Sequence, residues 1–122
     1  MRRAAFFVLA LCAATASVAA PDANARAEIE SLFARLAASP CQFHRNGNWH
    51  DGASAAKHLH AKYDVMVERQ MITSTESFIE RAATQSSMSS QPYLVRCQGA
   101  APVPSAEWFR AELRQLRALP AR

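Results

Sequence analysis

The stretch from residue 41 to residue 63 contains all four histidines of the 122-residue chain, at His44, His50, His58 and His60. Neutral imidazole is a frequent ligand of zinc and copper, and it also exchanges protons near neutral pH. The cluster therefore suggests a metal site or a histidine-dependent enzyme. On a helix, however, His58 and His60 point about 200° apart and cannot bind the same ion. We predict neither a metal nor a cofactor.

The alternative is a site in which His50 and His58 meet a carboxylate such as Asp51 or Asp64. No spacing in the sequence brings these groups together, so a histidine-dependent enzyme or metal-binding protein is the second hypothesis. Ser86 lies in a serine-rich run and lacks the Gly-x-Ser-x-Gly pattern that positions a hydrolase nucleophile. We therefore predict no catalytic residue and a protein that is not an enzyme.

A different kind of site is suggested by His58 and Lys62, which are four residues apart and share one face of a helix. If the preceding segment packs over that face, Arg45 and Asn46 meet them, with His50 close by. Arg45 would supply a planar fork of donors and Lys62 a point charge, which together suit an anion. These five residues form the candidate recognition patch.

The same residues also have a structural interpretation, which weighs somewhat more from the sequence alone. His58 would be hydrogen-bonded at the rim of the core, and Arg45 would pair with Glu76 or with a carbonyl group. Asn46 would only supply a turn residue. The sequence leaves both interpretations open.

The N-terminus has the pattern of a secretory signal peptide. Two arginines follow Met1, and residues 4–16 form an apolar run that is too short to span a bilayer. Small residues offer cleavage sites at 14–16, 17–19 and 23–25. We predict a signal peptide at residues 1–20, a single domain at residues 21–122, a periplasmic location and no transmembrane segment in the mature protein.

Cysteine content agrees with export. Cys12 lies in the apolar run and leaves with the signal peptide, because the large Leu11 before it disfavours lipidation. The remaining pair, Cys41 and Cys97, is expected to form a disulfide in an oxidising compartment. Closing this loop would stabilise the fold by about 4 kcal/mol in the chain-entropy model.

Charge gives little further guidance about partners. The formal net charge is +4 and becomes +2 without Arg2 and Arg3, so we predict no nucleic-acid binding. Arg110, Arg114 and Arg117 share one side of the last expected helix and would suit an acidic partner or anionic lipid. Nearby glutamates dilute this face, and a charged stripe is more often only solvated.

Apolar periodicity predicts an α+β fold with about four helices and a small antiparallel sheet of two or three strands. Apolar stripes at 29–36, 56–71, 78–83 and 106–116 mark the helices. The expected helix caps are Asp22 or Asn24, Asp51, a capping box at 73–76, and Ser105. Alternation around Asn46-Gly47 predicts a hairpin, and residues 93–97 predict a further strand.

Several of these residues together resemble the YfeK-like family of small bacterial periplasmic proteins of unknown function. The residues that carry the resemblance are Phe43, Arg45, Asn46, Gly47, His50, Ala56, His58, Leu59, Lys62, Glu76, Phe78, Ile79, Ser86, Ser87, Pro92, Tyr93 and Val95. The resemblance implies a signal peptide and one small domain, and it implies no activity. Ser74 stands where the family usually has Thr, and Ser90 where it usually has Gly, which would take a positive φ more readily.

The sequence thus predicts an exported module of the cell envelope with a binding or structural role. Its partner is unknown, and an envelope protein or peptide is the leading candidate. A purely structural envelope protein without a discrete site is a third, weaker hypothesis.

Overall fold

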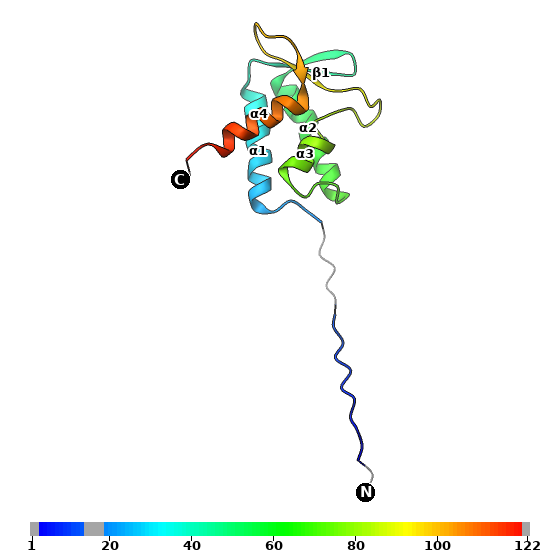
Figure 1. Ribbon diagram of the computed structural model, residues 1–122. Helices are drawn as coiled ribbons and strands as arrows, with labels where there is room; N and C mark the ends of the chain where they lie inside the picture. The colour runs from blue at the N-terminus through cyan, green and yellow to red at the C-terminus, as the bar shows by residue number, and fades with distance from the viewer. Residues whose placement is uncertain (1–2, 14–18, 121–122) are drawn as a thin grey trace.

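The computed structural model describes residues 3–13 and 19–120 (Figure 1). In this part of the chain the helices are α1 (Ala23–Ala38), α2 (Gly52–Glu68), α3 (Thr75–Arg81) and α4 (Ser105–Arg117). The strands are β1 (Gln42–Arg45), β2 (Asn48–Asp51), β3 (Leu94–Arg96) and β4 (Val103–Pro104). The predicted α+β class is confirmed, with one strand more than the two or three predicted.

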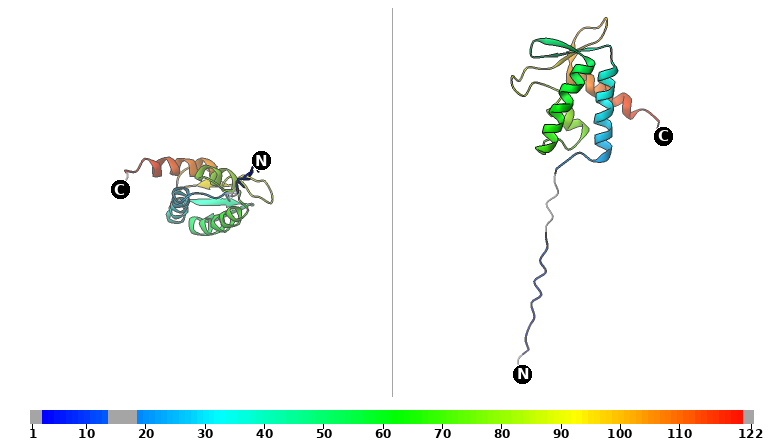
Figure 2. Two further views of the ribbon diagram at one scale, coloured as in Figure 1. Left: turned by 90° about the horizontal axis from the view of Figure 1, so that it is seen from below. Right: turned by 180° about the vertical axis from the view of Figure 1, so that it is seen from behind.

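The strands form one antiparallel sheet in the order β2-β1-β3-β4, which lies across one end of the helices (Figures 1 and 2). The predicted hairpin is confirmed. Asn46 and Gly47 connect β1 to β2 with φ values of 49° and 86°. Both lie in the left-handed region that a two-residue turn between twisted strands requires. β4 was not predicted, because a strand of two residues, one of them Pro104, is too short to show alternating apolar and polar residues.

α1 and α2 pack side by side (Figure 2). The predicted caps Asp22 and Asp51 are confirmed, since their carboxylates accept hydrogen bonds from the backbone N–H groups of Ala25 at 2.8 Å and Ser54 at 2.7 Å. Gly52 lets the two helices approach, because a Cβ there would overlap the backbone carbonyl of Leu36. The apolar residues predicted to face inward from these helices are buried at Ile29, Leu32, Phe33, Leu36, Ala56, Leu59 and Tyr63. Residues 70 and 71 lie beyond α2 and are exposed, contrary to the extension suggested for its stripe.

Phe78 of α3 lies at the centre of the core. Its ring makes edge-on contacts with Phe33 of α1, Tyr63 of α2 and Phe109 of α4, at centroid distances of 5.2, 5.6 and 5.8 Å. Such contacts stabilise a core by more than the buried area alone. One short helix therefore joins the other three.

Two of the predicted caps are wrong. α3 is capped by Ser74 with Ser77 as its reciprocal partner, one residue later than the predicted box at 73–76. α4 has no side-chain cap: Pro104 occupies the cap position, and Ser105 is the first helical residue. The Ser105 side chain is buried, and its hydroxyl has no hydrogen-bond partner among the described residues. Tertiary packing, rather than local hydrogen bonding, starts this helix.

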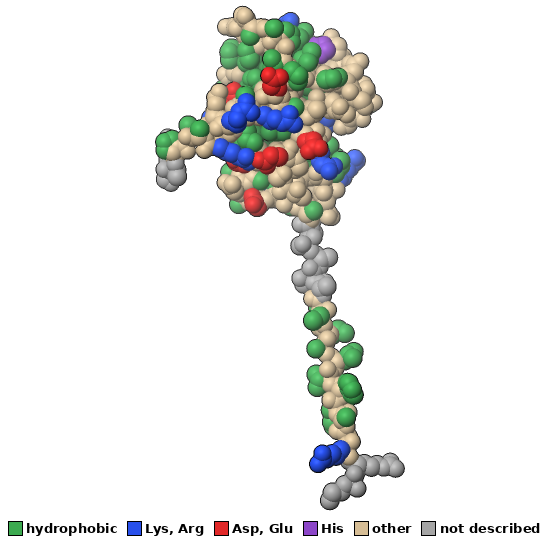
Figure 3. Space-filling view, in the orientation of Figure 1, with side chains coloured by type: hydrophobic (Ala, Val, Ile, Leu, Met, Phe, Trp, Pro, Cys, Tyr) green, Lys and Arg blue, Asp and Glu red, His purple; other side chains and the backbone are tan. Residues whose placement is uncertain are grey.

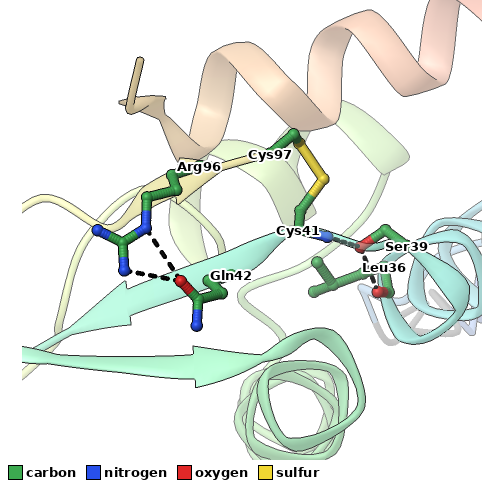
Figure 4. The surroundings of a disulfide bond; sticks show 6 residues. All are labelled: Leu36, Ser39, Cys41, Gln42, Arg96 and Cys97. Atoms are coloured by element: carbon green, nitrogen blue, oxygen red, sulfur yellow. Dashed lines mark hydrogen bonds between the residues drawn. A yellow bond between two sulfur atoms is a disulfide. The ribbon is translucent and has the colours of Figure 1, made fainter. Parts of the chain in front are cut away.

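The predicted disulfide between Cys41 and Cys97 is present, across a separation of 56 residues (Figure 4). It joins the segment after α1 to the end of β3. Next to it, the guanidinium of Arg96 donates two hydrogen bonds to Oε1 of Gln42, at 3.0 and 2.7 Å. The disulfide and this bidentate contact secure the same pair of neighbouring strands.

An ion-pair network ties α4 to α1 and α3. Arg117 donates to both oxygens of Glu28, at 2.9 and 3.1 Å, and lies 2.6 Å from Glu76. The buried Thr75 donates to Glu28 at 2.7 Å. Figure 3 shows basic and acidic side chains next to each other on this face of the molecule. Arg110 and Arg114 lie near Arg117, as predicted, around a small hollow of about 270 Å³.

The N-terminal segment contributes nothing to the core. Residues 3–13 form neither helix nor strand, and Phe6 and Phe7 are more than nine-tenths exposed. The predicted cleavage sites at 14–16 and 17–19 fall largely on residues 14–18, which lie outside the described residues. Within the described chain, no helix combines the length and apolar character needed to cross a membrane.

Candidate functional site

A groove with a volume of about 500 Å³ runs between α2, the hairpin turn and the segment 84–93. Four side chains of basic type line it: Arg45, His58, Lys62 and Arg69. None of the acidic residues in the described chain does so. Asn46 lines it as well, so four of the five residues of the candidate recognition patch share one surface. The exception is His50.

The geometry of α2 explains why these side chains align. His58, Lys62 and Arg69 follow one another at intervals of four and seven residues, which returns a helix to nearly the same face. Arg45 reaches the same face from the last position of β1, just before the hairpin turn. The turn residue Asn46 accepts a hydrogen bond on Oδ1 from the hydroxyl of Ser89, at 2.8 Å.

Lys62 connects the two walls of the groove. Its Nζ donates to the backbone carbonyl of Gln85 at 2.8 Å and to the Tyr93 hydroxyl at 3.3 Å, and it lies 5.0 Å from the Tyr93 ring centroid. Burial lowers the pKa of Lys62 and raises that of Tyr93. An ammonium group has three donors, so one N–H of Lys62 still points to other acceptors.

His58 is half-buried beside these cations. Burial lowers the pKa of His58, and the positive charges of Arg45, Lys62 and His50 lower it further. The charged groups that act on this imidazole are all cationic, so it stays neutral at pH 7. A neutral imidazole donates one hydrogen bond and accepts another, and it adds no charge to the groove.

Arg45 does not make the pair with Glu76 suggested by the structural interpretation. Glu76 is bound to Arg117 on another face of the molecule. The guanidinium of Arg45 forms no hydrogen bond or ion pair with any described residue, although the side chain is only partly exposed. Its five N–H donors therefore face the groove or solvent.

Much of the remaining groove lining is apolar. The sequence placed Met66 and Met71 on the apolar stripe of a helix and predicted no apolar groove. Its walls include Val65, Met66, Met71 and Met88. Four large apolar residues are exposed in the described chain from residue 19 onward, and three of them, Val65, Met71 and Met88, line this groove. The fourth, Leu119, lies near the C-terminus. Exposed apolar side chains that gather in one hollow mark a binding surface more often than scattered ones do.

The serine-rich loop forms the far wall, and the side chains of Ser86 and Ser89 accept hydrogen bonds from the backbone of its turn. The buried Ser86 accepts hydrogen bonds from the backbone N–H groups of Met88 and Ser89, both at 3.3 Å. Such side-chain bonds to nearby backbone stabilise turns. Ser90 adopts a φ of 59°. This is a left-handed backbone, which glycine adopts more readily than serine.

His60 occupies the opposite side of α2, as the helical geometry predicts. Its Nε2 lies 2.8 Å from Glu30 of α1, and its Nδ1 lies 3.2 Å from Asp64. His50 is on β2 opposite Phe43, outside the groove lining, although its charge is felt by His58. The described residues hold no group of three histidine, cysteine or acidic side chains placed to bind a metal ion.

These features define a small, disulfide-linked α+β protein with an amphipathic groove. Arg45, His58 and Lys62 gather at one end of the groove, Arg69 lies toward the other end, and exposed apolar side chains line much of the rest. The chain belongs to the family of unknown function DUF5329, whose profile matches residues 23–117. The match covers all four helices and all four strands. No curated protein and no solved structure matched the chain.

Proposed function

We propose that the protein is an exported, non-enzymatic binding module of the cell envelope, and that its groove takes an anionic partner. One observation carries this proposal: Arg45, Lys62 and Arg69 share the groove with three exposed apolar side chains and with no described carboxylate. A gathered apolar surface is typical of a binding site, and unpaired positive charge beside it attracts an anionic partner.

Export is supported by the N-terminus and by the disulfide. The apolar segment follows two arginines, and its large side chains between Phe6 and Leu11 are exposed instead of joining the core. This pattern is typical of a signal peptide. Disulfides persist in oxidising compartments such as the bacterial periplasm. Cleavage after residue 25 would remove the Asp22 cap of α1, so cleavage near residue 20 is the arrangement that keeps the domain intact. The narrower assignment to the YfeK-like periplasmic proteins is part of this proposal.

A photoreactive amino acid at position 88 tests the proposal, because Met88 is 95% exposed and borders the groove. We expect irradiation of intact cells to give a crosslinked product that Arg45→Glu abolishes. Arg81→Glu is the matched control, since Arg81 is exposed on α3 and makes no described side-chain hydrogen bond. The same photoreactive group at position 119 should give no product that depends on Arg45.

Thermal unfolding separates binding from stability in this experiment. If Arg45→Glu lowers the melting temperature and leaves the products unchanged, Arg45 has a structural role and the proposed function is wrong. Equal products from positions 88 and 119 would also contradict it, because they would show that the groove is not the contact surface.

A further inference from the structure

We infer that the groove binds a single-chain aliphatic carboxylate, with the carboxylate beside Arg45 and the chain along the apolar wall. This inference rests on the binding role proposed above and names the ligand for that site. Three features of the groove carry it: the donors at its basic end, the length and chemistry of its apolar wall, and the scarcity of polar groups along that wall.

The basic end offers donors that suit one carboxylate. The guanidinium of Arg45 is partly buried and free of described partners, and its planar fork matches the two oxygens of a carboxylate. Lys62 has one N–H left after its bonds to Gln85 and Tyr93, and the neutral His58 adds one more donor. The planar fork of Arg45, which offers two parallel donors to two oxygens, is therefore the feature of this end that favours a carboxylate.

The apolar wall continues from this end along α2. Met66 lies eight residues beyond His58, about 12 Å along the helix axis at the usual rise per residue. Val65 and Met66 form one side, and Met71 and Met88 extend it from outside the helix. Methionine is unbranched and flexible, so such a wall adapts to an aliphatic chain. A volume of about 500 Å³ is in the range of pockets for small molecules rather than for two-chain lipids.

A peptide segment fits this wall poorly. A peptide backbone brings an N–H and a C=O at each residue, and these groups lose free energy when they are buried without partners. Between the cations at its two ends, the groove offers few polar side chains: those of Ser86, Ser87 and Tyr93, of which the Tyr93 hydroxyl already accepts a hydrogen bond from Lys62. Neither edge strand of the sheet, β2 or β4, contributes a residue to the groove lining, so a peptide in the groove could not pair with the sheet through its backbone.

Arg69 lies at the far end of the groove from Arg45. Comparing variants of these two arginines therefore tests which end of the groove holds the carboxylate. Arg69 is exposed, so its charge is screened by solvent, whereas Arg45 is partly buried. We expect Arg45→Gln to weaken binding about tenfold or more and Arg69→Gln to weaken it about twofold or less. The reverse order would overturn the proposed orientation.

The test is calorimetric titration of the purified, disulfide-bonded protein with octanoate, decanoate and dodecanoate below their micelle concentrations. We expect the affinity to rise about twofold to fourfold with each added methylene. Met88→Ser should reduce this dependence on chain length, and Leu119→Ser, the matched control on an exposed apolar residue outside the groove, should not. Arg81→Gln is the matched control for Arg45→Gln.

Two comparison ligands make the result decisive. Dodecyltrimethylammonium has the same chain with the opposite charge, and a short apolar peptide with a free C-terminus has the same charge on a polar backbone. Tighter binding of either compound than of dodecanoate would overturn the inference. So would an affinity that does not change with chain length.

The inference and the proposed function fail in different ways. If dodecanoate does not bind while the crosslinks from position 88 still depend on Arg45, the ligand class is wrong and the binding function stands. If both the titration and the crosslinking fail, the groove has no binding role, and both proposals are wrong.

Discussion

The two sides of α2 differ sharply, although His58 and His60 are only two residues apart. On the side of His60, α2 packs against α1, and the imidazole lies between the carboxylates of Glu30 and Asp64. On the side of His58, the neighbouring charges are Arg45 and Lys62, and no described carboxylate lines the surface. Both sides are hollowed, with about 500 Å³ each, but opposite charges pair on the first side and like charges line the second.

The difference shows which surface the fold itself needs. On the α1 side, Glu30 of α1 and Asp64 of α2 both contact His60, so the charges there have partners within the protein and one contact joins the two helices. On the groove side, burial lowers the pKa of Lys62, and burial together with neighbouring cations lowers the pKa of His58. Both groups lie beside exposed apolar side chains. Ion pairing within the protein therefore marks the structural side, and its absence among the described residues marks the candidate binding side.

Removal of the disulfide should have the largest effect on the closed part of the molecule. Cys41→Ala with Cys97→Ala opens the 56-residue connection, and we expect a loss of about 4 kcal/mol in the free energy of unfolding. The groove lies away from this bond, so the folded fraction should bind dodecanoate as before. Urea unfolding and titration well below the melting temperature measure the two effects. An unchanged free energy of unfolding would contradict this account of the disulfide.

Gly52→Ala tests the close contact between α1 and α2. The added Cβ overlaps the carbonyl of Leu36, so the helices must separate, and we expect a loss of about 3 kcal/mol. Ala53→Ser, on the exposed neighbouring position, is the control and should change stability little. Chemical denaturation of the two variants makes the comparison. Equal stability of both variants would mean that the helices do not approach closely at this point.

Ser90→Gly should remove an unfavourable backbone conformation from the loop that forms the far wall of the groove. Ser90 holds a positive φ of 59°. Because this backbone costs a residue with a side chain more than it costs glycine, we expect the free energy of unfolding to increase by about 1 kcal/mol. Urea unfolding measures the change, with Ser87→Gly as a control in the same loop without a positive φ, which should not stabilise the protein. A destabilising effect of Ser90→Gly would show that the side chain matters more than the backbone.

The pKa values of His58 and His60 should shift in opposite directions, which is the smallest effect that tests the comparison. Burial alone would lower the pKa of His60, but its hydrogen bond with Glu30 and the charges of Glu30 and Asp64 raise it overall. Burial and the nearby cations lower the pKa of His58. Nuclear magnetic resonance of the imidazole rings measures both values. Shifts of the same sign would break the comparison between the two sides.

The pH dependence of stability should follow from the directions of these two pKa shifts. The contribution of His60 is fully present below the ordinary pKa of about 6.5 and is lost as the pH rises through its folded-state pKa. For His58 the unfolded chain takes up the proton first as the pH falls below about 6.5, so acid reduces stability. His60→Gln should therefore cost more stability in acid than in base, whereas His58→Gln should gain relative stability as the pH falls.

Much of the fold could be predicted because it depends on local patterns. The stripe from Ile29 to Leu36 places its apolar side chains on one face of a helix wherever the helix packs. Asn46 and Gly47 tolerate the backbone that a tight hairpin needs, and Asp51 caps the helix that follows it. Such features act within a few residues, so the sequence displays them directly.

Besides small local errors, such as the capping box shifted by one residue, the sequence-based predictions failed where residues distant along the chain determine the contacts. Ser105 has a suitable hydroxyl for a cap, yet packing buries it inside the first turn of α4. Glu76 seemed available to Arg45, but the fold brings Arg117 to it instead. Gly52 gives no sign in the sequence that another helix will press against it. Each outcome depends on contacts between segments that are separated along the chain.

The recognition patch shows the same division. The sequence alone determined that His58 and Lys62 share a helix face away from His60, because the helical repeat requires it. Only the tertiary structure decided that Arg45 joins them and that Met88 closes the far wall, since the loop from 84 to 93 reaches α2 through Lys62. Helical periodicity is a property of the chain, whereas a groove is a property of surfaces that the fold brings together.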